Sequence, residues 1–210
     1  MNARTQRLLL LHALHLLVPA TLFFFDAPWL ASAGLFLGAF ALFHDTAHAN
    51  LGLPRSMNEA TLTITGALLG ISGHAGRRSH LFHHAHPGAA DDMEGRDVDA
   101  PLWLALLRAP ATLFVLLSKS WRSAEWLLVL VVVLLAPRQY VLVMLLGQAT
   151  MPLWAARLSH RPPAWLLRIA EPMARAGITV ATLFVTHEAH HARPWLPTFE
   201  LRVGERAQEM

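Results

Sequence analysis

The hydrophobic positions of the chain gather in long runs rather than in the spaced stripes of helices that bury one face. A helix needs about 20 mainly apolar residues to cross a bilayer. Four runs approach this length, in two pairs that are each separated by a short turn: residues 8–25, 29–48, 121–136 and 139–158. The turns contain Pro28 and Pro137, which favour a break between helices. The pattern therefore predicts an all-α membrane protein with four transmembrane helices in two hairpins.

Four other features of the hydropathy pattern need separate interpretation. Residues 60–72 are too short for a span, and residues 102–117 contain Arg108 and Pro110, which suit a helix lying in the membrane interface or packed on protein. The first run also resembles a signal peptide, but it is long for one and more apolar sequence follows at once, so we expect it to be retained. Residues 201–210 are polar and predict a solvated tail.

The composition supports a membrane protein made of a single domain. Of 210 residues, 54% are hydrophobic and 15% are charged, and the mean hydropathy is +0.39. The chain has no cysteine, which excludes disulfide bonds, thiolate metal sites and cysteine nucleophiles. Its pI is about 10.5, but the basic residues occur singly or in pairs rather than in one patch, so we expect no nucleic-acid partner.

The positions of the basic residues predict how the chain is oriented. Of the 17 Lys and Arg residues, only Arg138 falls in the two proposed outer turns. Positive residues accumulate on the cytoplasmic side of membrane proteins, so both termini are predicted to be cytoplasmic. Four spans then place residues 44–120 and 159–210 on the same side. We expect these two segments to form a cytoplasmic helical cap.

This predicted cap contains three histidine motifs, "HDTAH", "HLFHH" and "HEAHH". Their histidines are three or four positions apart, which places them on one side of a helix: His44 and His48; His80, His83 and His84; His187, His190 and His191. His160, in "LSHRPP", falls at the inner end of the fourth predicted span. We predict that all nine histidines are metal ligands and converge at the inner membrane boundary.

Imidazole is a ligand for iron, zinc, copper and nickel, and nine rings exceed the needs of one four-coordinate ion. Two metal ions are therefore the natural number. Soluble di-iron bundles use glutamates with a pair of ExxH motifs, whereas this chain has one such match, Glu188 with His191. An all-nitrogen site with open positions can still bind and activate dioxygen at ferrous iron.

The order HxxxH, HxxHH, HxxHH in a four-span protein resembles the membrane fatty acid desaturase and hydroxylase superfamily. The surrounding letters "HDxxH", "HHAHPGAADD" and "HHARPWLP" add to the resemblance, which extends over residues 40–198. It implies a non-haem di-iron centre held by the eight histidines of the three motifs. Such a centre uses dioxygen and two external electrons to act on a lipid hydrocarbon, most simply by fatty acyl desaturation or hydroxylation. The electrons would come from a separate donor such as ferredoxin or cytochrome b5 with its reductase.

The short chain and "LSHRPP" also resemble the carotenoid ring ketolases and hydroxylases of this superfamily, so the substrate is either a membrane lipid or a carotenoid. Beyond the metal ligands, the sequence predicts no catalytic residue. Nearby residues have less specific interpretations. Asp45, Asp91 and Asp92 are candidates to accept hydrogen bonds that orient the ligand rings, with solvated acids as the alternative, and Arg77 and Arg78 are interpreted as interfacial anchors. His86 and, with less support, His74 are candidates for a further position around the metals, whereas His12 and His15 are interpreted as packed or hydrogen-bonded histidines of the first span.

Three alternatives are open at this stage. His187, Glu188 and His191 also satisfy HExxH, in which two histidines bind zinc and the glutamate is the general base of a metalloprotease. A divalent-metal transporter would also use membrane histidines, although its site is expected near the midplane. The histidines could also be hydrogen-bonded core residues, which explains a single histidine more easily than eight at ligand spacing.

Overall fold

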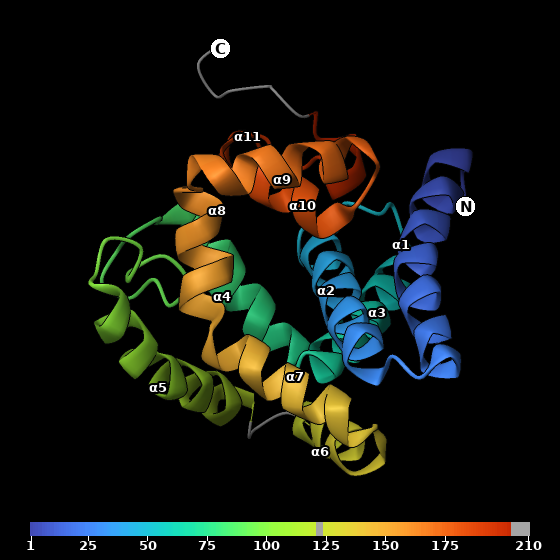
Figure 1. Ribbon diagram of the computed structural model, residues 1–210, viewed down its shortest axis with the longest axis horizontal. Helices are drawn as coiled ribbons and strands as arrows, with labels where there is room; N and C mark the ends of the chain where they lie inside the picture. The colour runs from blue at the N-terminus through green and yellow to red at the C-terminus, as the bar shows by residue number, and fades with distance from the viewer. Residues whose placement is uncertain (121–123, 203–210) are drawn as a thin grey trace.

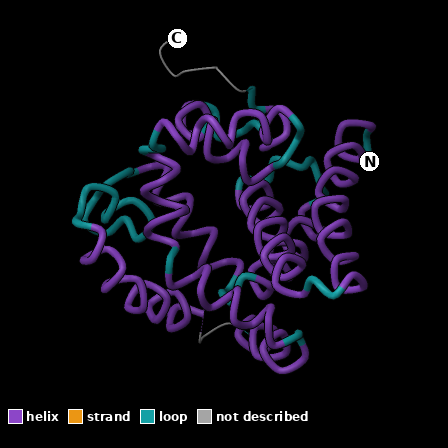
Figure 2. The backbone as a smooth tube through the Cα atoms, in the orientation of Figure 1, coloured by secondary structure: helices purple, strands orange, loops and turns teal. Residues whose placement is uncertain are grey.

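The structure, a computed structural model, describes residues 1–120 and 124–202, without the side chains at positions 112, 113 and 116–120. Within these residues every regular element is a helix, which confirms the predicted all-α class (Figures 1 and 2). The ends of α2, α4, α8 and α11 that carry the histidines lie near one another.

The first hairpin agrees with its prediction. Helix α1 (Ala3–Thr21) continues into the 3-10 turn η1 (Leu22–Phe25), and α2 (Pro28–Ala47) returns beside it. A Cβ atom at Gly38 would lie 2.6 Å from a backbone oxygen of α1, so the glycine allows the two backbones to approach closely. Residues 3–25 and 28–47 are both long and apolar enough to cross a membrane.

The second hairpin differs from its prediction. Helix α6 (Glu125–Leu135) has 11 residues, and its length of about 16 Å is half of a bilayer's hydrocarbon core. Residues 121–123 of the predicted span lie outside the described residues. Helix α7 (Arg138–Ala149) is followed by the π-helix η2 (Pro152–Arg157) and by α8 (Leu158–His160), and the chain bends by 54° between α7 and this second part.

Pro152 explains why the fourth predicted span is bent. Proline cannot donate the backbone hydrogen bond of a regular helix, and its ring clashes with the preceding turn. Two helices of the described chain can thus span a membrane, or three segments if α7 with η2–α8 is one broken span. The four-span topology and the cytoplasmic orientation stay predictions.

Helices α3 (Arg55–Leu68) and α4 (Gly73–Ala85) form a tight corner that brings the second motif to the centre of the molecule. A Cβ atom at Gly73 would lie 2.3 Å from the Leu62 carbonyl oxygen, so the start of α4 lies directly against the α3 backbone. Helix α5 (Leu102–Ser120) packs at the periphery against α4, α7 and η2. The core beneath the histidines is formed by side chains of α2, α3, the α3–α4 turn and α7: Phe36, Ala39, Phe43, Ala47, Leu62, Leu69, Ile71, Tyr140 and Met144.

The C-terminal segment lies across the ends of α2 and α8 and comprises α9 (Ala164–Arg175), α10 (Thr179–Val185), α11 (His187–Ala192) and η3 (Thr198–Glu200). Thr198 donates hydrogen bonds from its backbone N–H (3.0 Å) and hydroxyl (2.7 Å) to the buried carboxylate of Asp45. The chain therefore returns to the first motif after leaving the third. Leu201 is buried, so the predicted solvated tail cannot begin before residue 202, and residues 203–210 lie outside the described part.

Candidate metal centre

The structure brings all nine predicted histidines together in two neighbouring groups. His44 lies in the last turn of α2 and His48 directly after it, while the other histidines come from α4, α8 and α11. Within each group, one nitrogen of every ring lies within 4.8 Å of the others, which is close enough to hold a metal ion. The members of the first group are His44, His48, His80, His84 and His190, and those of the second are His83, His160, His187 and His191.

In both groups the rings point at one another through their Nε2 atoms. In the first group, the Nε2 of His48 lies 2.9 Å from that of His80 and 3.2 Å from that of His190. In the second, the Nε2 of His160 lies 3.1 Å from that of His83 and 3.0 Å from that of His187. Bonds of about 2.1 Å from one metal to two imidazoles at a right angle give a nitrogen–nitrogen separation of about 3.0 Å. The spacing in both groups therefore fits nitrogen ligands of a common ion.

Two buried or partly buried acids set the orientation of rings from α4. The Nδ1 of His83 lies 2.7 Å from Asp92, and the Nδ1 of His80 lies 2.9 Å from Glu94. An Nδ1–H that donates to a carboxylate leaves the Nε2 lone pair free for a metal. The two acids thus favour the protonation state that a ligand requires.

Asp92 is held by the loop after α4 as well as by His83. Its carboxylate is fully buried and accepts hydrogen bonds from the backbone N–H groups of Gly88 (2.8 Å), Gly95 (2.9 Å) and Glu94 (3.0 Å). Burial alone would raise the pKa of Asp92, but the hydrogen bonds from His83, Gly95 and Gly88 outweigh it and lower the pKa to about 2. Asp92 is therefore a fixed negative charge behind the second group.

Most of the clustered histidines are held in the neutral form. Burial, followed by repulsion from neighbouring imidazoles, lowers the pKa of His48 and His191 to about 3. The same two causes lower the pKa of His84, His187 and His190 well below the usual value. The Nε2 of His190 lies 3.2 Å from that of His48 and 3.1 Å from that of His84. One ring nitrogen carries at most one proton, so hydrogen bonds within the cluster satisfy these contacts less completely than a metal ion bound by all of the rings.

His83 and His44 differ from these rings in their hydrogen bonding. Burial lowers the pKa of His83, but its hydrogen bond to Asp92 more than compensates and the net shift is upward. The Nε2 of His44 is buried and has no hydrogen-bond partner in the described part of the chain. An unpartnered ring nitrogen inside a cluster of ring nitrogens fits a ligand of a metal ion.

The acids and arginines considered from sequence have different positions. Asp92 contacts a clustered histidine as an orienting acid should, whereas Asp91 is exposed and makes no contact of this kind. Asp45 lies 3.5 Å from His44 but 2.9 Å from the Nε2 of His12. Arg77 forms an ion pair with Glu59 rather than with Asp91 or Asp92, and Arg78 is exposed.

The four remaining histidines lie outside both groups. His86 is exposed and stacks on Phe82, with ring centroids 4.7 Å apart, and His74 lies between Glu59 and Glu125. His15 bonds to the Leu11 carbonyl oxygen within α1. His12 is buried against Asp45, so it lies closer to the first motif than its position in the first span suggests.

Sequence reasoning did not find Glu94 or the contact between His12 and Asp45. Glu94 follows Asp91 and Asp92 closely, and an acid near a histidine motif was a usable signal. The partner of His12 is 33 positions away, so its only signal was a polar residue within an apolar run.

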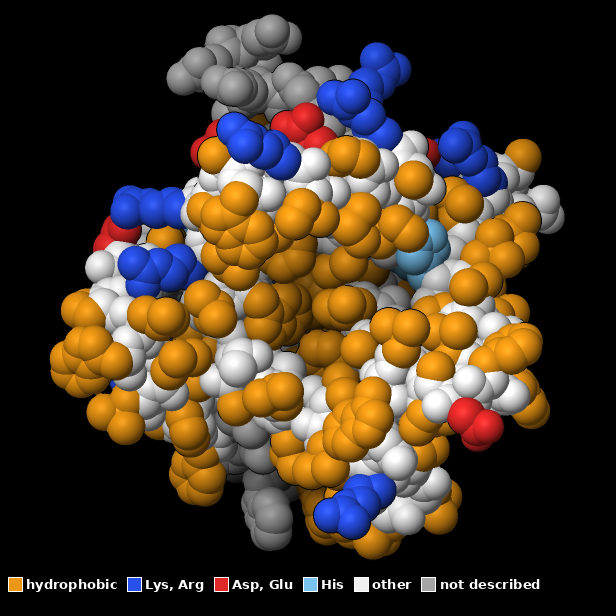
Figure 3. All heavy atoms as spheres, viewed as in Figure 1, with side chains coloured by type: hydrophobic (Ala, Val, Ile, Leu, Met, Phe, Trp, Pro, Cys, Tyr) orange, Lys and Arg blue, Asp and Glu red, His pale blue; other side chains and the backbone are white. Residues whose placement is uncertain are grey.

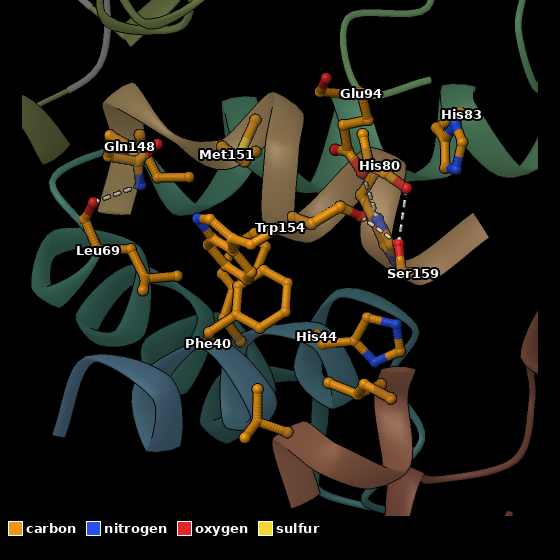
Figure 4. A pocket seen from close by; sticks show the side chains of 18 of the residues that line it. Phe40, His44, Leu69, His80, His83, Glu94, Gln148, Met151, Trp154 and Ser159 are labelled. Carbon is orange, nitrogen blue, oxygen red and sulfur yellow. Dashed lines mark hydrogen bonds and ion pairs between the residues drawn. The ribbon is translucent and has the colours of Figure 1, made fainter. Parts of the chain in front are cut away.

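An apolar cavity reaches the histidine groups from between α2, η2 and α10. His44, His80, His83 and His187 lie at one end, and the walls are mostly aromatic and aliphatic side chains such as Phe40 (Figure 4). In the space-filling view the molecule is hollowed between these elements, and hydrophobic side chains predominate around the hollow, with most charged side chains toward the rim (Figure 3). The cavity therefore offers an apolar ligand a route to the histidine groups.

Comparison of the chain with known protein families, with curated proteins and with solved structures finds no match.

Proposed function

We propose that the protein is a dioxygen-dependent, membrane-bound di-iron oxidoreductase that acts on a lipid hydrocarbon, by fatty acyl desaturation or hydroxylation. The observation that carries this proposal is the convergence of nine imidazoles, in two groups, at the end of an apolar cavity. Two groups of histidines imply two metal ions, and the apolar cavity implies that the molecule presented to these ions is a hydrocarbon.

The donor set supports iron over other metals. Four or five ring nitrogens per group leave coordination positions open, and open positions at nitrogen-bound ferrous iron suit dioxygen. The nearness of the groups supports joint use of the ions, because His83 and His84 are consecutive residues of α4 that belong to different groups. When bound, the two irons would supply the redox chemistry with dioxygen, with two electrons coming from an external donor such as ferredoxin or cytochrome b5.

The chain's own residues would hold the irons, orient the imidazole rings and exclude water from the cavity. Asp92 and Glu94 fix the rings of His83 and His80 so that Nε2 faces inward. Phe40, Phe43 and Leu183 keep water from the cavity and align an apolar chain beside the histidines. In a desaturation, dioxygen accepts four electrons, two from the donor and two from a saturated carbon–carbon unit, and with the two hydrogens of that unit and two protons it leaves as two waters.

The rival functions find less support. A protease of the HExxH type needs Glu188 beside the metal, but Glu188 is exposed while His187 is buried and turned into the second group. A metal transporter must release its ion, whereas five of the nine rings here are buried, the other four are partly buried, and the cavity beside them is apolar. A carotenoid substrate is the second candidate, and the mostly aromatic and aliphatic cavity wall is compatible with it.

The direct test is to express the chain with its membranes, to supply a reductase system and oxygen, and to profile lipids and carotenoids by mass. Loss of two hydrogens indicates desaturation, gain of one oxygen indicates hydroxylation, and replacement of a methylene by a carbonyl indicates ketone formation. We expect one of these changes in the wild type and none in the His187→Ala variant. His86→Ala is the matched control, because His86 lies outside both groups. A wild-type membrane that contains iron-loaded protein but shows no oxygen-dependent change contradicts the proposal.

A further inference from the structure

One polar side chain lines the cavity away from the histidines. Gln148, on α7, is 7% exposed and contributes to the cavity wall. In Figure 4 Gln148 and Leu69 lie on one side of Trp154 and Phe40, while His44, His80 and Ser159 lie on the other. Gln148 therefore marks the end of the cavity that is far from the metal centre.

The orientation of the Gln148 amide follows from its hydrogen bond. Its Nε2 donates to the Leu69 carbonyl oxygen at 2.7 Å. A carbonyl oxygen only accepts, so the nitrogen of the amide must face Leu69 and the oxygen Oε1 must face away from it. In the described part of the chain, the bond to Leu69 is the only hydrogen bond of the Gln148 side chain, so Oε1 has no protein partner.

Gln148 is largely buried and lines the cavity, and native proteins rarely leave the amide oxygen of such a residue without a ligand or water as partner. The neighbouring wall is formed by apolar side chains, including Leu69, Ile71, Met151 and Trp154. A buried water needs two to four polar partners, and this wall offers it little besides Oε1. A hydrogen-bond donor carried by the ligand itself is the better partner.

We propose that this end of the cavity is a hydroxyl subsite, in which Gln148 Oε1 accepts a hydrogen bond from an elongated apolar molecule that bears a hydroxyl group. Gln148 and the histidines lie on opposite sides of Trp154 and Phe40 in Figure 4, and the bent segment from Gln148 to Ser159 spans at most about 16 Å. The ligand must therefore be long if its hydroxyl lies at Gln148 while another part lies at the histidines. Oxidation of a carbon near the histidines rests on the proposed function. Binding of the hydroxyl at Gln148 does not depend on that function.

The test uses a competition that does not depend on iron or oxygen. Wild-type protein in detergent is mixed with equal amounts of cetyl alcohol and cetyl methyl ether, and the bound species are separated by native mass spectrometry. The ether keeps the chain and the oxygen but cannot donate a hydrogen bond. We expect the alcohol to be bound about five- to tenfold in excess, which is the effect of one net hydrogen bond. Equal binding of the two probes overturns the proposal, and this result needs no variant.

Two variants locate the preference. Gln148→Leu should abolish it, and Gln148→Glu, which keeps an acceptor oxygen, should retain at least part of it. Gln139→Leu is the matched control, since Gln139 lies on the same helix but does not line the cavity. An undiminished preference in folded Gln148→Leu protein overturns the subsite. In the wild type, absence of the preference together with normal oxidation of lipids would contradict the subsite alone, whereas a clear preference without any oxidation would contradict the proposed function alone.

Discussion

The two histidine groups are built differently. The first has five rings and is supported by Glu94, whose side chain is 25% exposed, through His80. The second has four rings and is supported through His83 by Asp92, which is fully buried and held by three backbone N–H groups. The first group therefore keeps four rings if one is lost, whereas the second keeps three and is held in a more rigid surrounding. The difference indicates that metal binding in the second group depends more strongly on each ring.

Removing one ring from each group should have the largest effect on metal content and should show the difference between the groups most clearly. We expect His160→Ala to lose about one of two bound metal ions, because three rings remain in its group, and His84→Ala to lose less, because four remain. Metal content per chain, measured by inductively coupled plasma mass spectrometry, checks this. Equal losses in the two variants would show that the groups do not differ as described, and His86→Ala should retain the wild-type content.

The buried acid comes next in expected effect. Asp92→Asn should weaken metal binding about 10- to 100-fold in the second group, because the amide places an NH₂ against donors that now face a carboxylate. Titration against a chelator of known affinity measures the loss. If the affinity for both ions falls to the same extent, Asp92 does not act through His83 alone.

Substitution of Glu94 should reduce metal affinity less than substitution of Asp92. Its carboxylate is partly exposed and orients only one ring of five, so we expect Glu94→Gln to weaken binding in the first group by less than about tenfold. The same chelator titration applies. A larger loss than in Asp92→Asn would reverse the comparison between the two groups.

The smallest effect is expected from the contact that joins the C-terminal segment to α2. Thr198→Val removes the hydroxyl that donates to Asp45 at 2.7 Å but keeps the backbone donor. Loss of one net hydrogen bond should lower the free energy of unfolding by about 1 kcal/mol, with little change in metal content. Thermal unfolding in detergent measures the first and metal analysis the second. A loss of metal comparable to that of Glu94→Gln would place Asp45 among the supports of the first group.

Local sequence spacing was sufficient for the histidines. Rings three or four positions apart on a helix share a face, so each motif could be identified as a unit before any tertiary contact was known. His160 was found from its place at the end of an apolar run, and the structure brings it to the second group. Whether these rings bind iron is a prediction that the fold alone does not test.

Other features depend on contacts that hydropathy does not report. The run over residues 139–158 is apolar throughout its first part, yet Pro152 divides it into α7 and η2 with a bend of 54°. This bend lies within the segment that carries Trp154, which lines the cavity, and His160. The contact between His12 and Asp45 joins positions far apart in the chain, and only a folded structure shows it.

Metal analysis of protein purified from membranes without chelators tests the central claim most directly. The two groups predict about two iron ions per chain in the active protein, with each group contributing one. Active protein that contains no iron, or that contains a single zinc ion, would contradict the account.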